Sequence, residues 1–307
     1  MAFVRQSVRF LLAGLLLFFL ISPFVQTQTS LKSAAFSVQW QRFVTSFGML
    51  LLYRSFYTFP FATFLSVITQ KHVPFRNAFT LFHLANITRY LPGRIWGVVR
   101  LLSLSHRFGL SKTAVGSSLT LHVGIETALG GLISLSILFS PKIRESALGI
   151  LEKFSGHTLL LTLGVAGIFT GLLLGIPKLA HHARGFLKTL VPLLKNAQLW
   201  VNALTVHSLL WCCQGLAFFL FVRSFVPLQW IDAGGLVACF AFAWIVGFLS
   251  FLTPGGLGIR EGLLGLLLSN YMLHAQATLV VLLCRLWMLS AEILLAVTSF
   301  FLQREHT

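Results

Sequence analysis

Acidic side chains are scarce in this chain. Asp and Glu number 7 against 23 Lys and Arg, and all charged residues make up 10% of the 307 positions. A soluble domain usually carries about 25% charged residues. The mean hydropathy of +0.86 therefore indicates an integral membrane protein. The net charge of +16 could indicate nucleic-acid binding, but the basic residues are spread over short loops between apolar segments. The positive-inside rule and an anionic lipid surface explain that placement, so we expect no nucleic-acid partner.

Cysteine is also sparse, and no catalytic or cofactor motif is present. The four cysteines, Cys212, Cys213, Cys239 and Cys284, all lie in apolar segments without CxxC or Cys/His ligand spacing. They are interpreted as small buried hydrophobic residues. The sequence contains no Ser nucleophile motif, no P-loop and no dinucleotide fingerprint. We therefore expect no metal site and no cofactor.

Long apolar segments are what the chain does contain. A bilayer needs roughly 20 apolar residues for one helix, and three segments reach that length: 199–222, 233–252 and 277–302. Further spans are expected at 113–139, at 157–176, and at 36–70, the last tilted because Arg42 and Arg54 interrupt it. We expect a mixed-charge loop at 141–156 and a strongly basic loop at 177–197. The sequence thus predicts an all-α, polytopic transmembrane bundle in a single domain, 1–307.

The N-terminal segment allows two interpretations. Arg5 and Arg9 precede an apolar run, 10–21, which fits a first span at about 8–26. The same pattern resembles a signal peptide cleaved near residues 33–35. We favour the span, because this charge placement also suits a cytoplasmic N-terminus.

Two short segments centred on Pro-Gly resemble each other. They are Tyr90–Gly97 and Leu252–Glu261, and their prolines, Pro92 and Pro254, lie 162 positions apart (254 − 92). Pro and Gly break helices, and broken backbone in a bilayer is tolerated only where protein or a wet cavity satisfies it. A pair of such breaks at corresponding places in two halves indicates the binding site of a membrane transporter.

The breaks also predict a topology. Short helical pieces at 78–91, 95–108 and 259–270 flank them and are too short to cross alone. If both breaks are re-entrant hairpins, the halves 36–140 and 198–302 form an inverted repeat linked by the span at 157–176. Segment 231–252 is long enough to cross fully, which is the alternative to the second hairpin.

Lys and Arg then divide 11 to 5 in favour of a cytoplasmic N-terminus and C-terminus in the plasma (inner) membrane. The cytoplasmic residues would be Arg5, Arg9, Lys71, Arg76, Arg107, Lys112, Lys178, Arg184, Lys188, Lys195 and Arg304. The opposite side would hold Lys32, Lys142, Arg144, Lys153 and Arg223.

Ionisable residues inside the predicted spans are the main candidates for a site. They are Glu126, Arg260, Glu261, Arg285 and Glu292. A charge at the bilayer centre costs about 2.5–3.5 kcal/mol on insertion scales, so we expect these residues to face the interior and to pair. Arg285 and Glu292 are seven positions apart and share one helix face. The alternative is a set of ion pairs that only lock the bundle.

The breaks bring further candidates. Helix starts offer free N–H groups and partial positive charge to an anion, and Gly255, Gly256 and Gly258 would let a head group approach the backbone. Arg89 and Arg94 flank Pro92-Gly93 and could bind phosphate in a bidentate way. Arg100 fits snorkelling to the interface better. His122 and Glu126, four apart, are expected to form a polar pair, with a proton relay as the alternative.

These motifs resemble those of the lysylphosphatidylglycerol synthase transmembrane-domain family, over about 36–302. The resemblance is carried by Arg89–Trp96, Gly109-Leu110-Ser111, Glu126, Pro254–Gly262, Arg285 and Glu292. That family includes the flippase half of bacterial multiple-peptide-resistance proteins and stand-alone inner-membrane proteins associated with envelope lipid or glycan synthesis. The resemblance implies a protein that moves or handles a lipid. The aminoacyl-transfer domain of the fused enzymes is missing here, so we expect no enzymatic activity.

The sequence therefore predicts a lipid translocase whose partner is a membrane lipid with an anionic head group: a phospholipid, an aminoacyl-phospholipid or a polyprenyl phosphate. The alternative is a non-catalytic membrane partner of an envelope glycosyltransferase. The expected substrate-binding residues are Arg89, Pro92, Gly93, Arg94, Glu126, Pro254, Gly255, Gly256, Gly258, Arg260, Glu261, Arg285 and Glu292.

Overall fold

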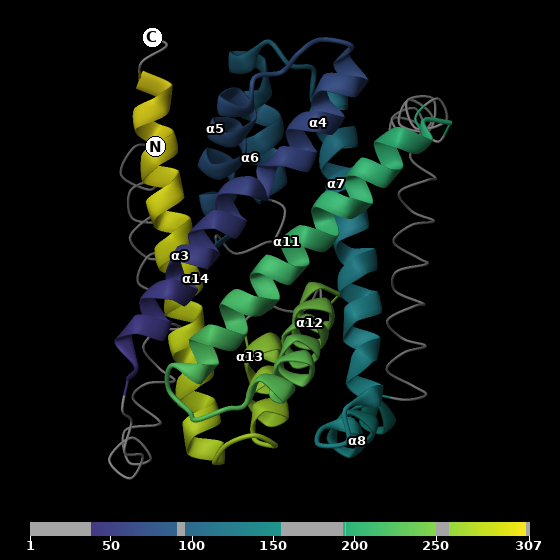
Figure 1. The fold of residues 1–307 in the computed structure, drawn as a ribbon. Coiled ribbons are helices and arrows are strands. Elements are labelled where there is room, and N and C mark those ends of the chain that lie inside the picture. Colours follow the sequence, from purple (N-terminus) through teal and green to yellow (C-terminus); the bar gives the residue numbers. More distant parts are fainter. Residues whose placement is uncertain (1–37, 91–95, 155–192, 194, 250–257, 305–307) are drawn as a thin grey trace, which may run out of the picture.

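The structure, a computed structural model, describes residues 38–90, 96–154, 193, 195–249 and 258–304. All regular secondary structure in these ranges is helical (Figure 1). Within these ranges, four helices are long and apolar enough to cross a membrane: Lys112–Phe139, Ala197–Arg223, Trp230–Phe248 and His274–Gln303. The prediction of an all-α membrane protein is confirmed at this level. The spans predicted at 8–26 and 157–176 and most of the 177–197 loop lie outside the described residues.

The long helices agree closely with the predicted spans. They are α7 (Lys112–Leu135), which continues into η3 (Ser136–Phe139), α11 (Ala197–Arg223), α12 (Ala233–Leu249) and α14 (His274–Arg304). Side-chain caps fix where two of them begin. Ser111 Oγ accepts from the Ala114 N–H at 3.1 Å, and Asn196 Oδ1 accepts from the Leu199 N–H at 3.0 Å.

The tilted span expected at 36–70 forms two helices, α3 (Trp40–Phe56) and α4 (Thr58–Thr69), which meet at Tyr57. Pro60 explains the break. Proline has no N–H to donate to the carbonyl four residues earlier, and it is tolerated in the first turn of a new helix. The pair runs obliquely across the bundle (Figure 1).

Each Pro-Gly break is flanked by two helices that pack against each other. The first hairpin (75–104) consists of α5 (Phe75–Asn86), η1 (Ile87–Tyr90) and α6 (Trp96–Leu104), and is followed by η2 (Ser105–Phe108). The second hairpin (233–268) consists of α12 and α13 (Ile259–Leu268). The two hairpins lie towards opposite ends of the bundle (Figure 1). Both turns lie outside the described residues, so the re-entrant hairpins and the inverted repeat stay predictions.

The arms of both hairpins converge close to the turns. In the first, Thr88 Oγ1 donates to the Trp96 carbonyl at 3.0 Å. In the second, a Cβ added to Gly247 would lie 2.8 Å from Arg260 Cβ, so only glycine permits this approach of α12 and α13.

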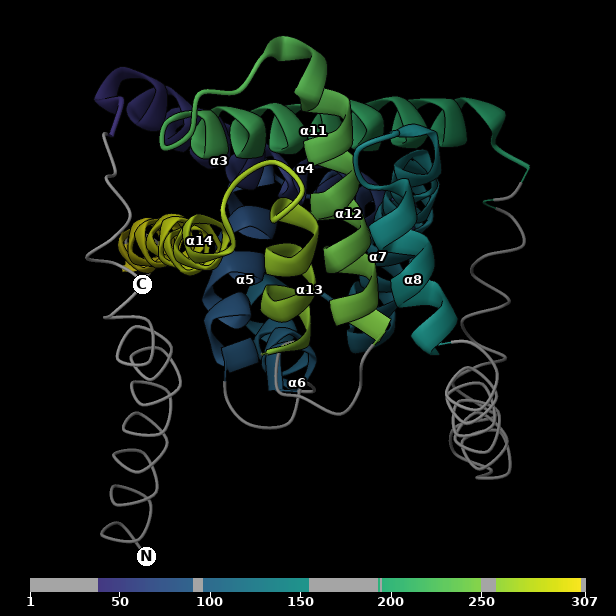
Figure 2. The same ribbon diagram turned by 90° about the horizontal axis from the view of Figure 1, so that it is seen from below.

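The hairpins lie between two long helices, α14 on one side and α7 on the other, while α3 and α11 cross over them (Figures 1 and 2). The largest core cluster joins α3, α11, α12, α13 and α14 and is rich in aromatic rings: Phe218, Phe219, Phe221, Phe240 and Trp287. Cys239 and Cys284 are buried in it, as predicted. Cys212 is exposed on α11, so the expectation that all four cysteines are buried is wrong.

One predicted loop is a helix. Residues expected to form a mixed-charge loop at 141–156 contain α8 (Arg144–Phe154). The segment is composed largely of good helix formers, and its apolar side is fixed by Ile143 and Ala147, which are fully buried. The alternating charges that predicted a loop show only that these side chains face water. An amphipathic surface helix also exposes its charged side chains to water.

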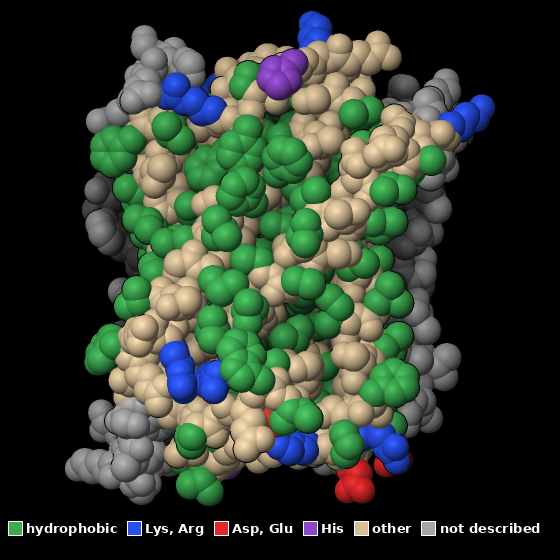
Figure 3. Space-filling view, viewed as in Figure 1, with side chains coloured by type: hydrophobic (Ala, Val, Ile, Leu, Met, Phe, Trp, Pro, Cys, Tyr) green, Lys and Arg blue, Asp and Glu red, His purple; other side chains and the backbone are tan. Residues whose placement is uncertain are grey.

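The two ends of the bundle carry different charges. Figure 3 shows hydrophobic side chains over the middle of one face and charged ones towards its ends. Around the first hairpin the described exposed charges are basic, among them Lys71, Arg100, Arg107 and Lys112. The opposite end exposes both signs, Lys142, Arg144, Glu145 and Glu152, and its buried Asp232 pairs with Lys142. We call the first the basic end. Such asymmetry is typical of a cytoplasmic face.

Candidate functional site

Three arginines and three glutamates lie between α3, α7, α13 and α14, and we call them the buried ion cluster. The members are Arg54 on α3, Glu126 on α7, Arg260 and Glu261 on α13, and Arg285 and Glu292 on α14. Their side chains are buried or largely buried, and their formal charges cancel when all are ionised. Five of the six were predicted from the sequence as interior charges.

Glu261 holds the start of α13 and binds α14. Its Oε1 accepts from Arg285 Nη1 at 2.7 Å, and its Oε2 accepts from the Gly258 N–H at 2.8 Å. Gly258 has a φ of +87°, a left-handed conformation that other residues adopt only with strain. One carboxylate therefore satisfies a free N–H at the helix start and neutralises an arginine on the neighbouring helix.

The second ion pair joins α3 to α14. Arg54 Nη2 lies 3.1 Å from Glu292 Oε1, and the two side chains are only 14% and 3% exposed. Arg54 Nε is buried and has no hydrogen-bond partner among the described residues. Arg285 and Glu292 both face inward from α14, as predicted, but each pairs with a different helix.

Glu126 is the most buried carboxylate of the cluster, with 2% of its surface exposed. The Tyr53 hydroxyl lies 3.5 Å from its Oε1, a long hydrogen bond, and its Oε2 has no partner among the described residues. Trp211 Nε1 donates to its backbone carbonyl at 3.1 Å. Since Tyr53 and Arg54 are consecutive, α3 links Glu126 to Glu292.

Arg260 contacts the second hairpin itself. Its guanidinium carbon lies 5.2 Å from the centre of the Phe240 ring, and its Nη2 lies 3.2 Å from Met288 Sδ. The ion pairs belong to one assembly, because Cys284 on α14 lies within electrostatic range of three members of the cluster: Arg54, Arg260 and Glu261.

The structure describes little or nothing of seven other predicted site residues. Arg89 lies in η1, where only its backbone is described. Six more lie outside the described residues: Pro92, Gly93, Arg94, Pro254, Gly255 and Gly256. Their contact with the cluster stays a prediction.

Sequence reasoning missed Arg54 and Tyr53 as site residues. Arg54 was identified only as an interruption of an apolar segment, although an interior charge was itself the signal used for the other five. Tyr53 carries no such signal, since tyrosine is common in apolar segments. Its role depends on the proximity of α3 and α7.

The polar pair predicted between His122 and Glu126 is wrong. Both are buried on one face of α7, but His122 Nδ1 lies 3.0 Å from His207 Nε2 on α11, while Glu126 lies beside Tyr53. His207 was not singled out, because nothing in the apolar sequence of α11 indicates a partner for it.

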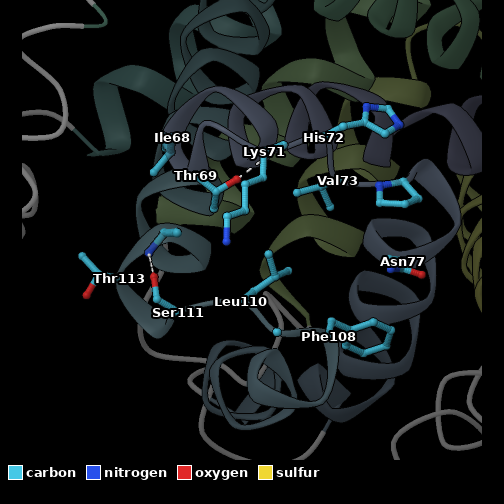
Figure 4. Close-up of a pocket in the computed structure, with 13 residues that line it drawn as sticks. Ile68, Thr69, Lys71, His72, Val73, Asn77, Phe108, Leu110, Ser111 and Thr113 are labelled. Carbon is cyan, nitrogen blue, oxygen red and sulfur yellow. Dashed lines mark hydrogen bonds between the residues drawn. The ribbon is translucent and has the colours of Figure 1, made fainter.

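A pocket of about 620 Å³ opens at the basic end, between the end of α4, the start of α5 and the start of α7. Figure 4 shows the Lys71 side chain extending into it, opposite Leu110 and Ser111. Its other lining residues include Ile68, Val73, Asn77 and Phe108. The pocket thus has mixed polar and apolar walls and one lysine, which suits an anionic head group with a short apolar part.

The described residues contain no group of three or more His, Cys, Asp or Glu side chains that could hold a metal ion. Comparison of the chain with protein-family models, with curated proteins and with solved structures finds no match. The family resemblance drawn from the motifs stays a prediction.

Proposed function

We propose that this protein is a translocase that moves a lipid with an anionic head group across the membrane in which it lies, the plasma (inner) membrane, with its basic end cytoplasmic. The observation that supports this most is the buried ion cluster. It brings three arginines into the helical bundle, and two of them, Arg54 and Arg285, are paired with carboxylates.

The energetics of buried ions favour a functional role for the cluster. Removing two charges from water costs several kcal/mol per ion, and their attraction offsets this only with good geometry. Apolar residues would lock helices at lower cost. A site that exchanges a carboxylate for a phosphate gives the arginines a second, equally stable partner, because guanidinium binds both anions in the same bidentate way.

In this mechanism the head group enters beside α13 and competes with Glu261 for Arg285. The free N–H groups at the start of α13 add partial positive charge at the same place. Arg89 and Arg94 of the first hairpin bring further cations from the other side. The lipid tails stay in the bilayer, and the displaced glutamates reclaim the arginines when the head group leaves.

The two hairpins supply the route. We propose that they are re-entrant, enter from opposite faces, and form the inverted repeat whose broken turns meet near the ion cluster. Their placement towards opposite ends of the bundle supports this (Figure 1). The pocket beside Lys71 would collect head groups on the cytoplasmic side before they reach the cluster.

The test uses the purified chain in vesicles of phosphatidylethanolamine and phosphatidylglycerol with a fluorescent phosphatidylglycerol. Dithionite added outside quenches only outer-leaflet dye, so translocation is measured as the protected fraction that becomes accessible. We expect the native protein to exchange the dye, Arg260→Gln and Glu261→Gln to fall to the level of empty vesicles, and Arg100→Gln to behave as native.

Two results would contradict the proposal. One is native exchange by Arg260→Gln and Glu261→Gln, which would make the charges structural. The other is no exchange by well-folded native protein of any anionic lipid supplied, including a polyprenyl phosphate. That result would favour the non-transporting partner of an envelope glycosyltransferase, for which co-purification from detergent extracts is the corresponding measurement.

A further inference from the structure

Two histidines outside the ion cluster form a hydrogen-bonded pair in the interior. His122 on α7 and His207 on α11 are both 0% exposed, and His122 Nδ1 lies 3.0 Å from His207 Nε2. His207 Nδ1 lies 2.7 Å from the Ala203 carbonyl oxygen. The mechanism proposed above uses neither residue.

The geometry fixes where the protons lie in the neutral pair. A carbonyl only accepts, so His207 Nδ1 carries a hydrogen and its Nε2 is a bare acceptor. His122 Nδ1 must then donate to that acceptor, which leaves His122 Nε2 bare. This nitrogen is buried and has no partner among the described residues. The pair therefore has one vacant position for a proton.

The surroundings of this position are aromatic and include the titratable Tyr57. The Tyr57 ring lies edge-on to His122 with centroids 4.4 Å apart, and the Phe82 ring lies at 6.1 Å. Of the elements packed on α7, α4 has no titratable side chain, α12 has only Cys239, α6 only Arg100, and η2 only the exposed His106 and Arg107. Besides His207, α11 carries Cys212, Cys213 and Arg223. From α3 come Tyr53 and Arg54, which lie beside Glu126.

Glu126 offers a second vacant position one helical turn from His122. Both side chains are buried on the same face of α7, and Glu126 Oε2 has no partner among the described residues. Two bare proton acceptors thus follow each other along one helix. Buried polar atoms normally have partners, so two unpartnered acceptors on one helix face offer a small ligand a place to bind.

We propose that this ligand is a proton, and that the His122–His207 pair loads one proton for each lipid moved; this rests on the proposed function. The proton binds Nε2 of His122, and the pair shares the added charge across its hydrogen bond. It then leaves His122 for the carboxylate of Glu126, which becomes neutral, and from there it departs on the other side. The proton and the lipid cross in the same direction. One proton cancels one negative charge of the head group, so their combined transport is electroneutral.

The coupling has a quantitative consequence in vesicles. With one proton per singly charged lipid, a gradient of one pH unit drives about a tenfold excess of tracer lipid into the leaflet on the alkaline side. The probe is the fluorescent phosphatidylglycerol at trace level, with dithionite accessibility as the readout. His122→Gln and His207→Gln should reduce the ratio to about one, while the exposed His106→Gln should keep it near tenfold.

A second measurement does not depend on lipid movement. In ¹⁵N-histidine NMR of the protein in detergent, the ring signals of His122 and His207 should shift together as the pH is lowered, and His207→Gln should change the titration of His122. A native protein that exchanges lipid with a ratio of one under the gradient overturns the coupling but leaves the translocase intact. Rings that titrate independently, or not at all, also overturn it. Joint titration without any lipid exchange would instead overturn the translocase.

Discussion

The two hairpins have similar outlines but different net charges. The first hairpin contains four arginines and no acidic residue: Arg76, Arg89, Arg94 and Arg100. The second contains one arginine and one glutamate, and that glutamate is bound both to the helix start and to Arg285. They also differ in length, because α5 has 12 residues and α12 has 17.

The difference indicates a division of roles. The second hairpin has no net charge, and its Glu261 neutralises Arg285 on α14 and accepts from the Gly258 N–H at the start of α13. The first has a surplus of positive charge that no acidic residue within it can balance. In the proposed mechanism the first hairpin attracts the head group, and the second exchanges its internal partner for that group.

The opposite placement of the hairpins gives the largest expected effect. With the four native cysteines replaced, Lys71→Cys before the first hairpin and Leu273→Cys after the second should react with a membrane-impermeant maleimide from opposite sides. Both positions are exposed. We expect Leu273→Cys to be labelled in intact cells and Lys71→Cys only after permeabilisation. Labelling of both from one side would break the inverted-repeat argument.

The contribution of the Arg285–Glu261 ion pair to stability should be separable from its role in lipid transport. Arg285→Gln leaves Glu261 without its partner, and breaking a buried pair costs about 3–5 kcal/mol of unfolding free energy. The double variant Arg285→Gln/Glu261→Gln removes both charges and should recover most of that stability, measured by denaturant titration in detergent. Neither variant should exchange lipid. Recovery of exchange in the double variant would show that the pair is structural.

The surplus of arginines in the first hairpin predicts smaller effects on lipid exchange, which differ from one arginine to another. Arg94→Gln should slow lipid exchange by about 10- to 150-fold, because one charge-assisted hydrogen bond contributes about 1.5–3 kcal/mol. Arg100→Gln, exposed on α6, should slow it by less than about twofold, since a solvated charge contributes little. Equal effects of the two substitutions would mean that the surplus acts only as a diffuse positive field. Initial exchange rates at two salt concentrations distinguish the two cases.

Backbone conformation at the second hairpin gives the smallest effect. Gly258→Ala forces a Cβ into a left-handed conformation and should lower the unfolding free energy by about 1–2 kcal/mol. Gly262→Ala, in the same helix with open space at its Cβ position, should raise it by up to about 1 kcal/mol. The opposite signs are the check. If both substitutions lower the unfolding free energy, the structure of residues 258–262 at the start of α13 differs from the one described here.

Much of the fold could be predicted, because hydrophobic length determines where helices cross. The segments at 113–139, 199–222 and 277–302 are helices with nearly the predicted ends. The helix α8 could not be distinguished from a loop, since the burial of Ile143 and Ala147 that orders it comes from other helices. Likewise Pro60 marks a break in the sequence, but nothing local shows that α3 and α4 continue as one oblique pair.

The candidate site divides in the same way. Interior charges are evident from the sequence alone, because a membrane makes each of them costly, and this determined Glu126, Arg260, Glu261, Arg285 and Glu292 as candidates. Their partners were not determined. Arg54 pairs with Glu292 over a separation of 238 positions (292 − 54), and His122 pairs with His207 over 85. Periodicity gives the face of a helix on which a charge lies, but which helix lies opposite that face depends on packing of the whole bundle, and only the tertiary structure decided it.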